Sequence, residues 1–273
     1  MFRSLVGFLF PHRWRGDLAE AERLLASSRP SLDGLGRKID AWLESPGWLV
    51  RNAAVKVIAR VNDHGRLPRL IEKLRERGEA GIVRRNAAEA LGRMGLATEP
   101  VRAALLAALS DRYWEVRAEA IRSLARLFAP AADLEEALLE LLFGRSRNSR
   151  LRVHEENFEV RMAIAQGLGH LGVSREALRA LVVLARDEMW LVRSQAAVGL
   201  AHLAARLPQF ADEAAETLRE LDRLSEGAVS YFVHRDVLGG AMRALRSRSG
   251  PEAIATLYLD PKKGWNHVRR PVG

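Results

Sequence analysis

The chain has 273 residues, no cysteine and a formal net charge of +9. The lack of cysteine excludes disulfides, thiolate metal sites and cysteine nucleophiles. No stretch reaches the roughly 18 apolar residues of a membrane-spanning helix, and only 6% of the residues are aromatic. Alanine and leucine dominate the apolar residues instead, so we expect a helical protein. The apolar N-terminus has no small-residue cleavage site, so we expect no signal peptide and place the protein in the cytoplasm.

The positive charge is concentrated in three short segments, residues 1–15, 145–152 and 261–273, which carry +3, +4 and +4. The rest of the chain therefore has a net charge of −2. A protein that wraps nucleic acid along its whole body would be basic throughout. Residues 1–15 also contain several large apolar side chains, which predicts capping of the first helices, docking on a partner, or peripheral membrane contact.

After a helix expected at about residues 17–27, the chain alternates between two kinds of helical run. The second run of each pair begins near a valine followed by arginine or, once, histidine: Val50-Arg51, Val83-Arg84, Val116-Arg117, Val160-Arg161, Val192-Arg193 and Val233-His234. Apolar-patterned runs precede these pairs at 67–77, 100–109, 131–143, 175–186 and 208–224. The valines are 33, 33, 44, 32 and 41 residues apart, and such a period predicts stacked helix pairs.

Counting from each valine, positions +4, +8 and +11 are mostly apolar or small and share one face of a helix. Positions +7 and +9 are small in most copies and include Gly92, Gly169 and Gly199. Because glycine costs helix stability, these glycines predict close approach of neighbouring helices.

Two segments carry the most complete form of the repeat, Asp111-Arg-Tyr-Trp-Glu-Val116-Arg117 and Asp187-Glu-Met-Trp-Leu-Val192-Arg193. They resemble HEAT repeats of the type found in phycobilin lyases and many bacterial scaffold proteins. The resemblance covers roughly residues 34–250 and implies an all-α solenoid, a superhelix of five to six stacked antiparallel helix pairs. It leaves residues 1–33 as an N-terminal segment with a capping helix, and residues 251–273 as a last helix with a basic tail.

The same resemblance implies a ladder of polar contacts between repeats, made by Asp111 with Arg117 and by Asp187 with Arg193. The arginine at position +1 recurs in every clear copy, and repeat arrays require the same interface chemistry in each unit. We therefore interpret these arginines as structural: Arg51, Arg84, Arg117, Arg161 and Arg193.

Position +10 is basic or potentially basic in all six copies: Arg60, Arg93, Arg126, His170, His202 and Arg243. A step of nine residues turns a helix by about 180°, so this row faces away from the +1 arginines. In HEAT-like arrays the second helix lines the concave surface, so the row is a candidate site for an acidic partner. The alternative is a solvated face with cations placed at helix C-termini, where the helix dipole favours them.

The 44-residue step contains an insertion at residues 144–157 with four arginines, Arg145, Arg147, Arg150 and Arg152. Insertions in repeat arrays map to loops on one face, often the binding face. Arginines suit contacts with carboxylates or phosphates. A flexible polar loop without a ligand remains an equal alternative.

The sequence contains no glycine-rich phosphate loop after a strand, no nucleophile elbow and no HExxH-type histidine pair. We therefore expect no enzyme, no cofactor and no metal, but a scaffold or assembly subunit that binds an acidic protein surface. The alternative is nucleic-acid binding, since alkylpurine DNA glycosylases are built from HEAT-like repeats. A third reading, a bilin lyase-type subunit, follows from the repeat resemblance alone. The oligomeric state is left open.

Overall fold

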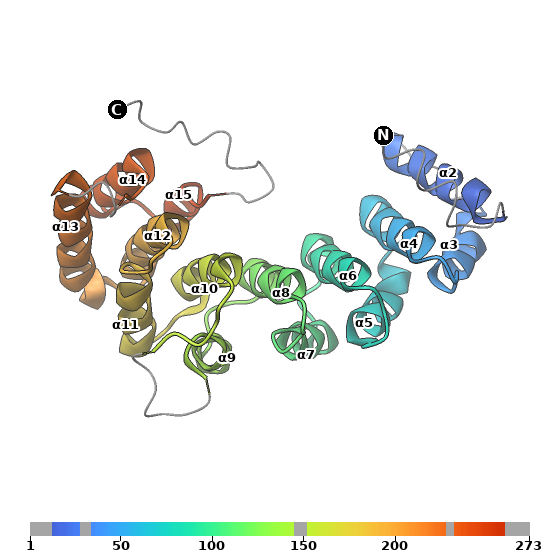
Figure 1. Ribbon diagram of the computed structural model, residues 1–273, viewed down its shortest axis with the longest axis horizontal. Coiled ribbons are helices and arrows are strands. Elements are labelled where there is room, and N and C mark those ends of the chain that lie inside the picture. The colour runs from blue at the N-terminus through green and yellow to red at the C-terminus, as the bar shows by residue number, and fades with distance from the viewer. Residues whose placement is uncertain (1–12, 28–33, 145–151, 228–231, 260–273) are drawn as a thin grey trace. The chain divides into compact units, whose positions relative to one another are not determined.

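A computed structural model describes residues 13–27, 34–144, 152–227 and 232–259, and every regular element in these ranges is a helix (Figure 1). The chain divides into two compact units, residues 1–127 and residues 128–273. Unit 1 and unit 2 each consist of stacked helix pairs, so the predicted helical class is confirmed.

Unit 1 pairs a first helix with a second helix three times, after an additional helix at its start. Its elements are α2 (Arg13–Ala26), α3 (Leu35–Leu43), α4 (Trp48–Val61), the 3-10 helix η1 (His64–Arg66), α5 (Leu67–Arg75), α6 (Gly81–Met94), α7 (Glu99–Ala108) and α8 (Trp114–Leu127). The second helices α4, α6 and α8 pack successively against one another, and α2 packs on α4. Helix α2 begins four residues before the predicted capping helix.

Unit 2 repeats this arrangement and ends with a short additional helix. Its elements are α9 (Ala132–Phe143), α10 (Phe158–Leu171), α11 (Arg175–Leu184), α12 (Trp190–Arg206), η3 (Pro208–Phe210), α13 (Ala211–Gly227), α14 (Arg235–Arg246) and α15 (Pro251–Ala255). The second helices α10, α12 and α14 pack in sequence, and α15 packs against α12 and α14. The predicted first runs therefore match α5, α7, α9, α11 and α13 to within a few residues.

Local sequence explains where several of these helices begin and end. Pro68 and Pro100 occupy the first turns of α5 and α7, where the missing amide hydrogen costs no helical bond. Gly95 follows α6 with φ +75°, the left-handed conformation that glycine adopts without a Cβ penalty. The side chains of Asn157 and Ser174 accept hydrogen bonds from the first amides of α10 and α11.

Small residues bring the second helices close together, as their positions predicted. At Gly92 of α6 an added Cβ would overlap Ser123 of α8, whose hydroxyl donates to the Ala88 carbonyl at 2.9 Å. In unit 2, a Cβ on Gly199 would lie 2.7 Å from the carbonyl oxygen of Ala165. Most of the buried apolar side chains are aliphatic, and Leu91 is fully buried. Within the described ranges no helix is long and apolar enough to cross a membrane.

Candidate functional site

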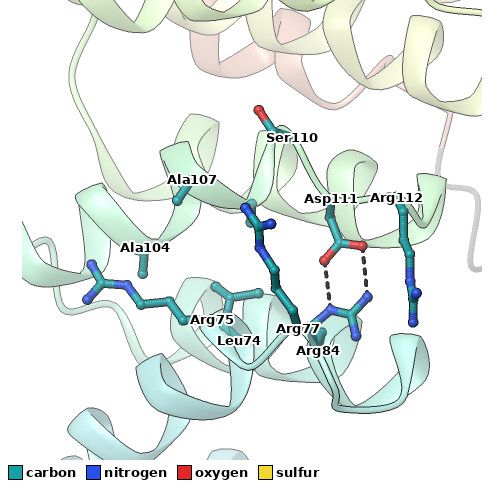
Figure 2. Close-up of a pocket in the computed structure, with 10 residues that line it drawn as sticks. Leu74, Arg75, Arg77, Arg84, Ala104, Ala107, Ser110, Asp111 and Arg112 are labelled. Atoms are coloured by element: carbon teal, nitrogen blue, oxygen red, sulfur yellow. Dashed lines mark hydrogen bonds and ion pairs between the residues drawn. The ribbon is translucent and has the colours of Figure 1, made fainter.

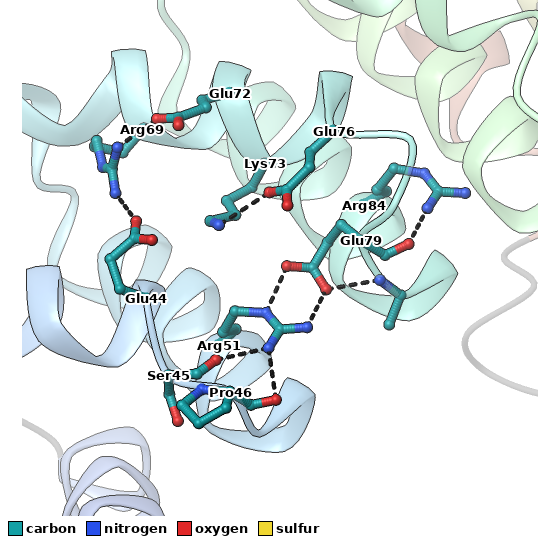
Figure 3. A network of polar contacts seen from close by, with 11 residues as sticks. Glu44, Ser45, Pro46, Arg51, Arg69, Glu72, Lys73, Glu76, Glu79 and Arg84 are labelled. Atoms are coloured by element: carbon teal, nitrogen blue, oxygen red, sulfur yellow. Dashed lines mark hydrogen bonds and ion pairs between the residues drawn. The ribbon is translucent and has the colours of Figure 1, made fainter.

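The +1 arginine of α4 joins two consecutive repeats of unit 1 (Figure 3). Arg51 donates to both carboxylate oxygens of Glu79 in the α5–α6 turn, at 2.6 and 2.7 Å. Its remaining nitrogen donates to the carbonyl oxygens of Ser45 and Pro46, at 2.6 and 3.0 Å. One guanidinium therefore binds the turn before its own helix and the corresponding turn of the next repeat.

The next arginine repeats this geometry. Arg84 donates to both carboxylate oxygens of Asp111 in the α7–α8 turn, at 2.7 and 2.9 Å (Figure 2). It also donates to the backbone carbonyl of Glu79 (Figure 3), and it is only 2% exposed. The charge is buried, but a bidentate carboxylate and a carbonyl satisfy its donors.

The electrostatics of both carboxylates follow from these partners. Burial alone would raise the pKa of Glu79, but hydrogen bonds from Arg51 and from the Ala80 amide hold that pKa below its ordinary value. Burial opposes ionisation of Asp111 as well, yet Arg84 and the Tyr113 amide lower its pKa. Both groups are therefore anionic at neutral pH.

Unit 2 contains the same joint. Arg161 donates to both oxygens of Asp187 at 2.7 and 3.0 Å, and to the carbonyl oxygens of Glu155 and Glu156. In the fifth copy Arg193 donates to the backbone oxygen of Phe232 at 2.6 and 3.2 Å.

These contacts modify the ladder implied by the HEAT resemblance. The carboxylate of Asp111 binds the arginine of the preceding repeat, Arg84, whereas Arg117 binds the Asp111 carbonyl at 2.9 Å. Asp187 likewise offers its carboxylate to Arg161 and its carbonyl to Arg193, the latter at 2.6 Å. Both predicted pairs therefore make contact, but through the backbone of the aspartate.

The sequence pattern missed one member of the ladder, Glu79. It lies four residues before Val83, one residue later than the aspartate position, which Gly78 occupies. A search for a carboxylate at either of the two positions would have found it. With Glu79 included, consecutive joints connect all three helix pairs of unit 1.

The +10 row of unit 1 consists of exposed arginines on α4, α6 and α8. Arg60 donates to the backbone carbonyl of Ser27 at 3.1 Å and remains exposed. The Arg93 side chain is 60% exposed and lies 3.7 Å from a carboxylate oxygen of Glu89 on its own helix. Arg126 is also exposed, and its guanidinium lies over Gly92 of the neighbouring helix. The row therefore presents cations on three consecutive second helices.

The +10 row of unit 2 differs because Tyr258, just after α15, covers two of its three residues, His170 and His202. The Tyr258 ring stacks on His170 with 5.3 Å between centroids, and its hydroxyl lies 3.2 Å from Nδ1 of His202. The two imidazoles contact each other edge to face at 4.2 Å. His202 is only 3% exposed, whereas Arg243 on α14 is exposed.

The covered histidines are not cations. Burial lowers the pKa of His170 to about 4, and Arg206 adds repulsion. Burial also lowers the pKa of His202 to about 3, with contributions from His170 and Arg206. Burial raises the pKa of Tyr258. At neutral pH all three rings are uncharged, so in this structure His170 and His202 do not present the positive charge expected of the row.

Two residues of unit 2 accommodate the segment that carries Tyr258. An added Cβ on Gly169 would overlap the Tyr258 hydroxyl, so only glycine leaves room for it. The Gln195 amide pairs with the backbone of Leu259 in both directions, donating at 3.0 Å and accepting at 3.2 Å. The C-terminal segment therefore lies on the face that the sequence analysis assigned to a partner.

Most of the remaining candidate residues lie outside the described ranges. Arg145, Arg147 and Arg150 belong to residues 145–151, and the basic segments at 1–12 and 260–273 fall outside as well. Arg152 is described and is exposed. Among the described residues, no group of three or more histidine, aspartate or glutamate side chains is arranged to hold a metal ion.

Comparison with known families agrees with this architecture. Residues 39–125 match a family model described as HEAT repeats. No curated protein matches the chain. The match falls within unit 1, and the helix pairs and arginine joints of unit 2 follow the same pattern. The predicted fold class, a HEAT-like α-solenoid, is therefore confirmed.

Proposed function

We propose that this chain, whose residues 39–125 belong to the HEAT-repeat family, is a non-enzymatic scaffold or assembly subunit of the cytoplasm. HEAT repeats provide a fold suited to protein interaction, and the second-helix face of unit 1 is the surface that binds. We define this face by the exposed +10 arginines Arg60, Arg93 and Arg126. Its partner is a protein with an acidic surface.

The observation that carries the proposal is the regular presentation of these cations. Each arginine occupies the same position of its repeat, and the three helices pack side by side. Packed helix axes lie about 8–10 Å apart, so the charges recur at roughly this interval. A partner with carboxylates at a similar spacing engages several arginines together. The +1 arginines are excluded from this role because their donors are used within the fold.

The arginines of the face lose little free energy when they exchange their present contacts for those of a partner. Among the described residues the ion-pair partner of Arg93 is Glu89, at 3.7 Å, which is longer than a hydrogen bond. An exposed ion pair contributes about 0.2–1 kcal/mol, so exchanging it for a partner's carboxylate loses little. Because each exposed ion pair contributes so little free energy, we expect charge complementarity to govern the specificity and the association rate of the complex more than its affinity.

The test compares two double variants that each lose two positive charges. Arg93→Gln with Arg126→Gln alters the face, whereas Arg219→Gln with Arg223→Gln alters α13, whose arginine side chains are 58% and 73% exposed. The full-length proteins are used as bait in host extract at 50 mM and at 500 mM salt. We expect wild type and the α13 variant to recover the same partner at low salt, and the face variant to lose about 2- to 30-fold of it.

Equal recovery by both double variants would contradict the proposal for this face. A second comparison, with Arg145, Arg147, Arg150 and Arg152 changed to alanine, tests the inserted loop in the same way. A titration with duplex DNA at low salt checks the competing class of ligand. Saturable DNA binding that the face variant abolishes would replace the protein partner by nucleic acid.

A further inference from the structure

A cavity of about 620 Å³ opens in unit 1, where the α5–α6 turn faces the α7–α8 turn (Figure 2). Its floor is apolar and consists of Leu74 from α5 with Ala104, Ala107 and Ala108 from α7. Its remaining lining residues are Arg75, Arg77, Arg84, Ser110, Asp111 and Arg112. A cavity of this volume is in the range that holds a small organic molecule.

The charges around this cavity do not balance. Asp111 is the single acid among the lining residues, and Arg84 occupies both of its oxygens. Arg75, Arg77 and Arg112 are exposed, and within the described ranges none of them forms an ion pair with a carboxylate. The lining thus retains three positive charges. In Figure 2 the side chain of Arg77 extends from the α5–α6 turn toward the end of α7.

Neighbouring arginines of the same unit form ion pairs with carboxylates. Arg66, just before α5, binds Asp40 at 2.9 Å, and Arg69 in the first half of α5 binds Glu44 and Glu72. The arginines at the start of α5 thus have ion-pair partners, whereas among the described residues Arg75 and Arg77 form no ion pair, although Glu72 and Glu76 lie beside Arg75 in a neighbouring groove. This contrast points to an anion supplied from outside the chain.

One of the three arginines is held in position before any ligand binds. The guanidinium of Arg112 lies 4.9 Å from the centroid of the Tyr113 ring, a cation–π contact. Tyr113 in turn packs on Gly81, where an added Cβ would come within 2.8 Å of the ring. Glycine at position 81 therefore lets the tyrosine approach the start of α6. A guanidinium fixed in this way loses less entropy on binding.

We propose that this cavity binds a small organic phosphate. Arg77 and Arg112 contact the phosphate oxygens, and the apolar part of the ligand lies over Leu74 and the alanines of α7. Guanidinium groups match phosphate oxygens in bidentate geometry, and a dianion compensates more of the excess charge than a single carboxylate does. The proposal is independent of the second-helix face, because the two sites share no residue.

The probe is phenyl phosphate, which combines a dianion with an apolar ring. It is titrated into the whole chain at pH 7.5 and low salt, and binding is measured by calorimetry. Inorganic phosphate and phenol are the reference ligands. We expect saturable binding of phenyl phosphate, binding of inorganic phosphate that is several-fold weaker, and no measurable binding of phenol. No saturable binding of phenyl phosphate, or equal affinity for inorganic phosphate, would overturn the proposal.

Two variants alter the site, and the α13 double variant is the control. Arg77→Gln with Arg112→Gln should weaken phenyl phosphate binding about 100-fold, since each of the two lost charge-assisted contacts contributes about a factor of ten. The α13 double variant loses the same charge elsewhere and should bind as wild type does. Ala107→Phe fills the cavity without changing charge and should remove the preference for phenyl phosphate over inorganic phosphate. Equal weakening by the α13 variant would show nonspecific charge attraction and refute the site.

Discussion

Removing one arginine of the ladder should destabilise unit 1 more than removing the whole joint. Arg84 is 2% exposed and is held by both oxygens of Asp111. Changing Arg84→Met keeps much of the aliphatic packing but leaves Asp111 largely buried without its partner. Breaking a buried pair on one side costs about 3–5 kcal/mol, whereas replacing both members by apolar residues is often near neutral. We therefore expect about 3 kcal/mol for Arg84→Met, and clearly less for Arg84→Met with Asp111→Leu.

The assay is native-state hydrogen exchange read by mass spectrometry, because a repeat array does not need to unfold in one step. Peptides from α6 and α8 report on unit 1, and peptides from α10 and α12 provide the internal reference. The double variant closes a mutant cycle that isolates the coupling between the two side chains. The ladder would be refuted if Arg84→Met and Asp111→Leu had additive effects on the free energy of opening, or if Arg84→Met cost less than about 1 kcal/mol.

Three further predictions concern helix contacts and the covered histidines. Gly169→Ala should displace Tyr258, since the new Cβ overlaps its hydroxyl; limited proteolysis should then cut near residues 251–259, and unchanged protection would contradict this. His202, with its pKa lowered to about 3, contributes stability that is fully present above the unfolded pKa of about 6.5 and is lost as pH falls below it. Urea unfolding at pH 7 and pH 4.5 should show about 2–3 kcal/mol of this loss, and His202→Gln should reduce the slope. Gly92→Ala should cost about 1–3 kcal/mol by overpacking against Ser123, and Ser123→Gly in the same chain should recover part of it in thermal melts.

The sequence predicted the helix pairs because their determinants are local and repeated. A valine followed by arginine or, once, histidine recurs every 32 to 44 residues near the start of each second helix, and apolar positions at helical spacing identify the buried side. The structural role of Arg51 and Arg84 followed from the same regularity, since an identical contact has to recur at each joint. The contact of Glu79 was not predicted, because a turn can supply a carboxylate from either of two adjacent positions.

The charges of the +10 row could not be predicted from local sequence. Arg93 and His202 occupy equivalent positions of their repeats, yet one is an exposed cation and the other a buried neutral ring. The difference comes from Tyr258, which is 56 residues away from His202 in the chain. No periodicity in the sequence indicates that this tyrosine returns to the second-helix face. The proposed phosphate site also depends on two turns brought together by packing, and its exposed arginines form no ion pair with a carboxylate of the described residues.

The repeat by itself therefore determined the helices, their pairing and the arginine of each joint, because these depend on side chains at fixed short spacing. Only the tertiary structure decided which members of a repeated row keep their charge in water and which lose it. Ionisation depends on burial and on neighbours in space, and segments distant in the sequence supply both.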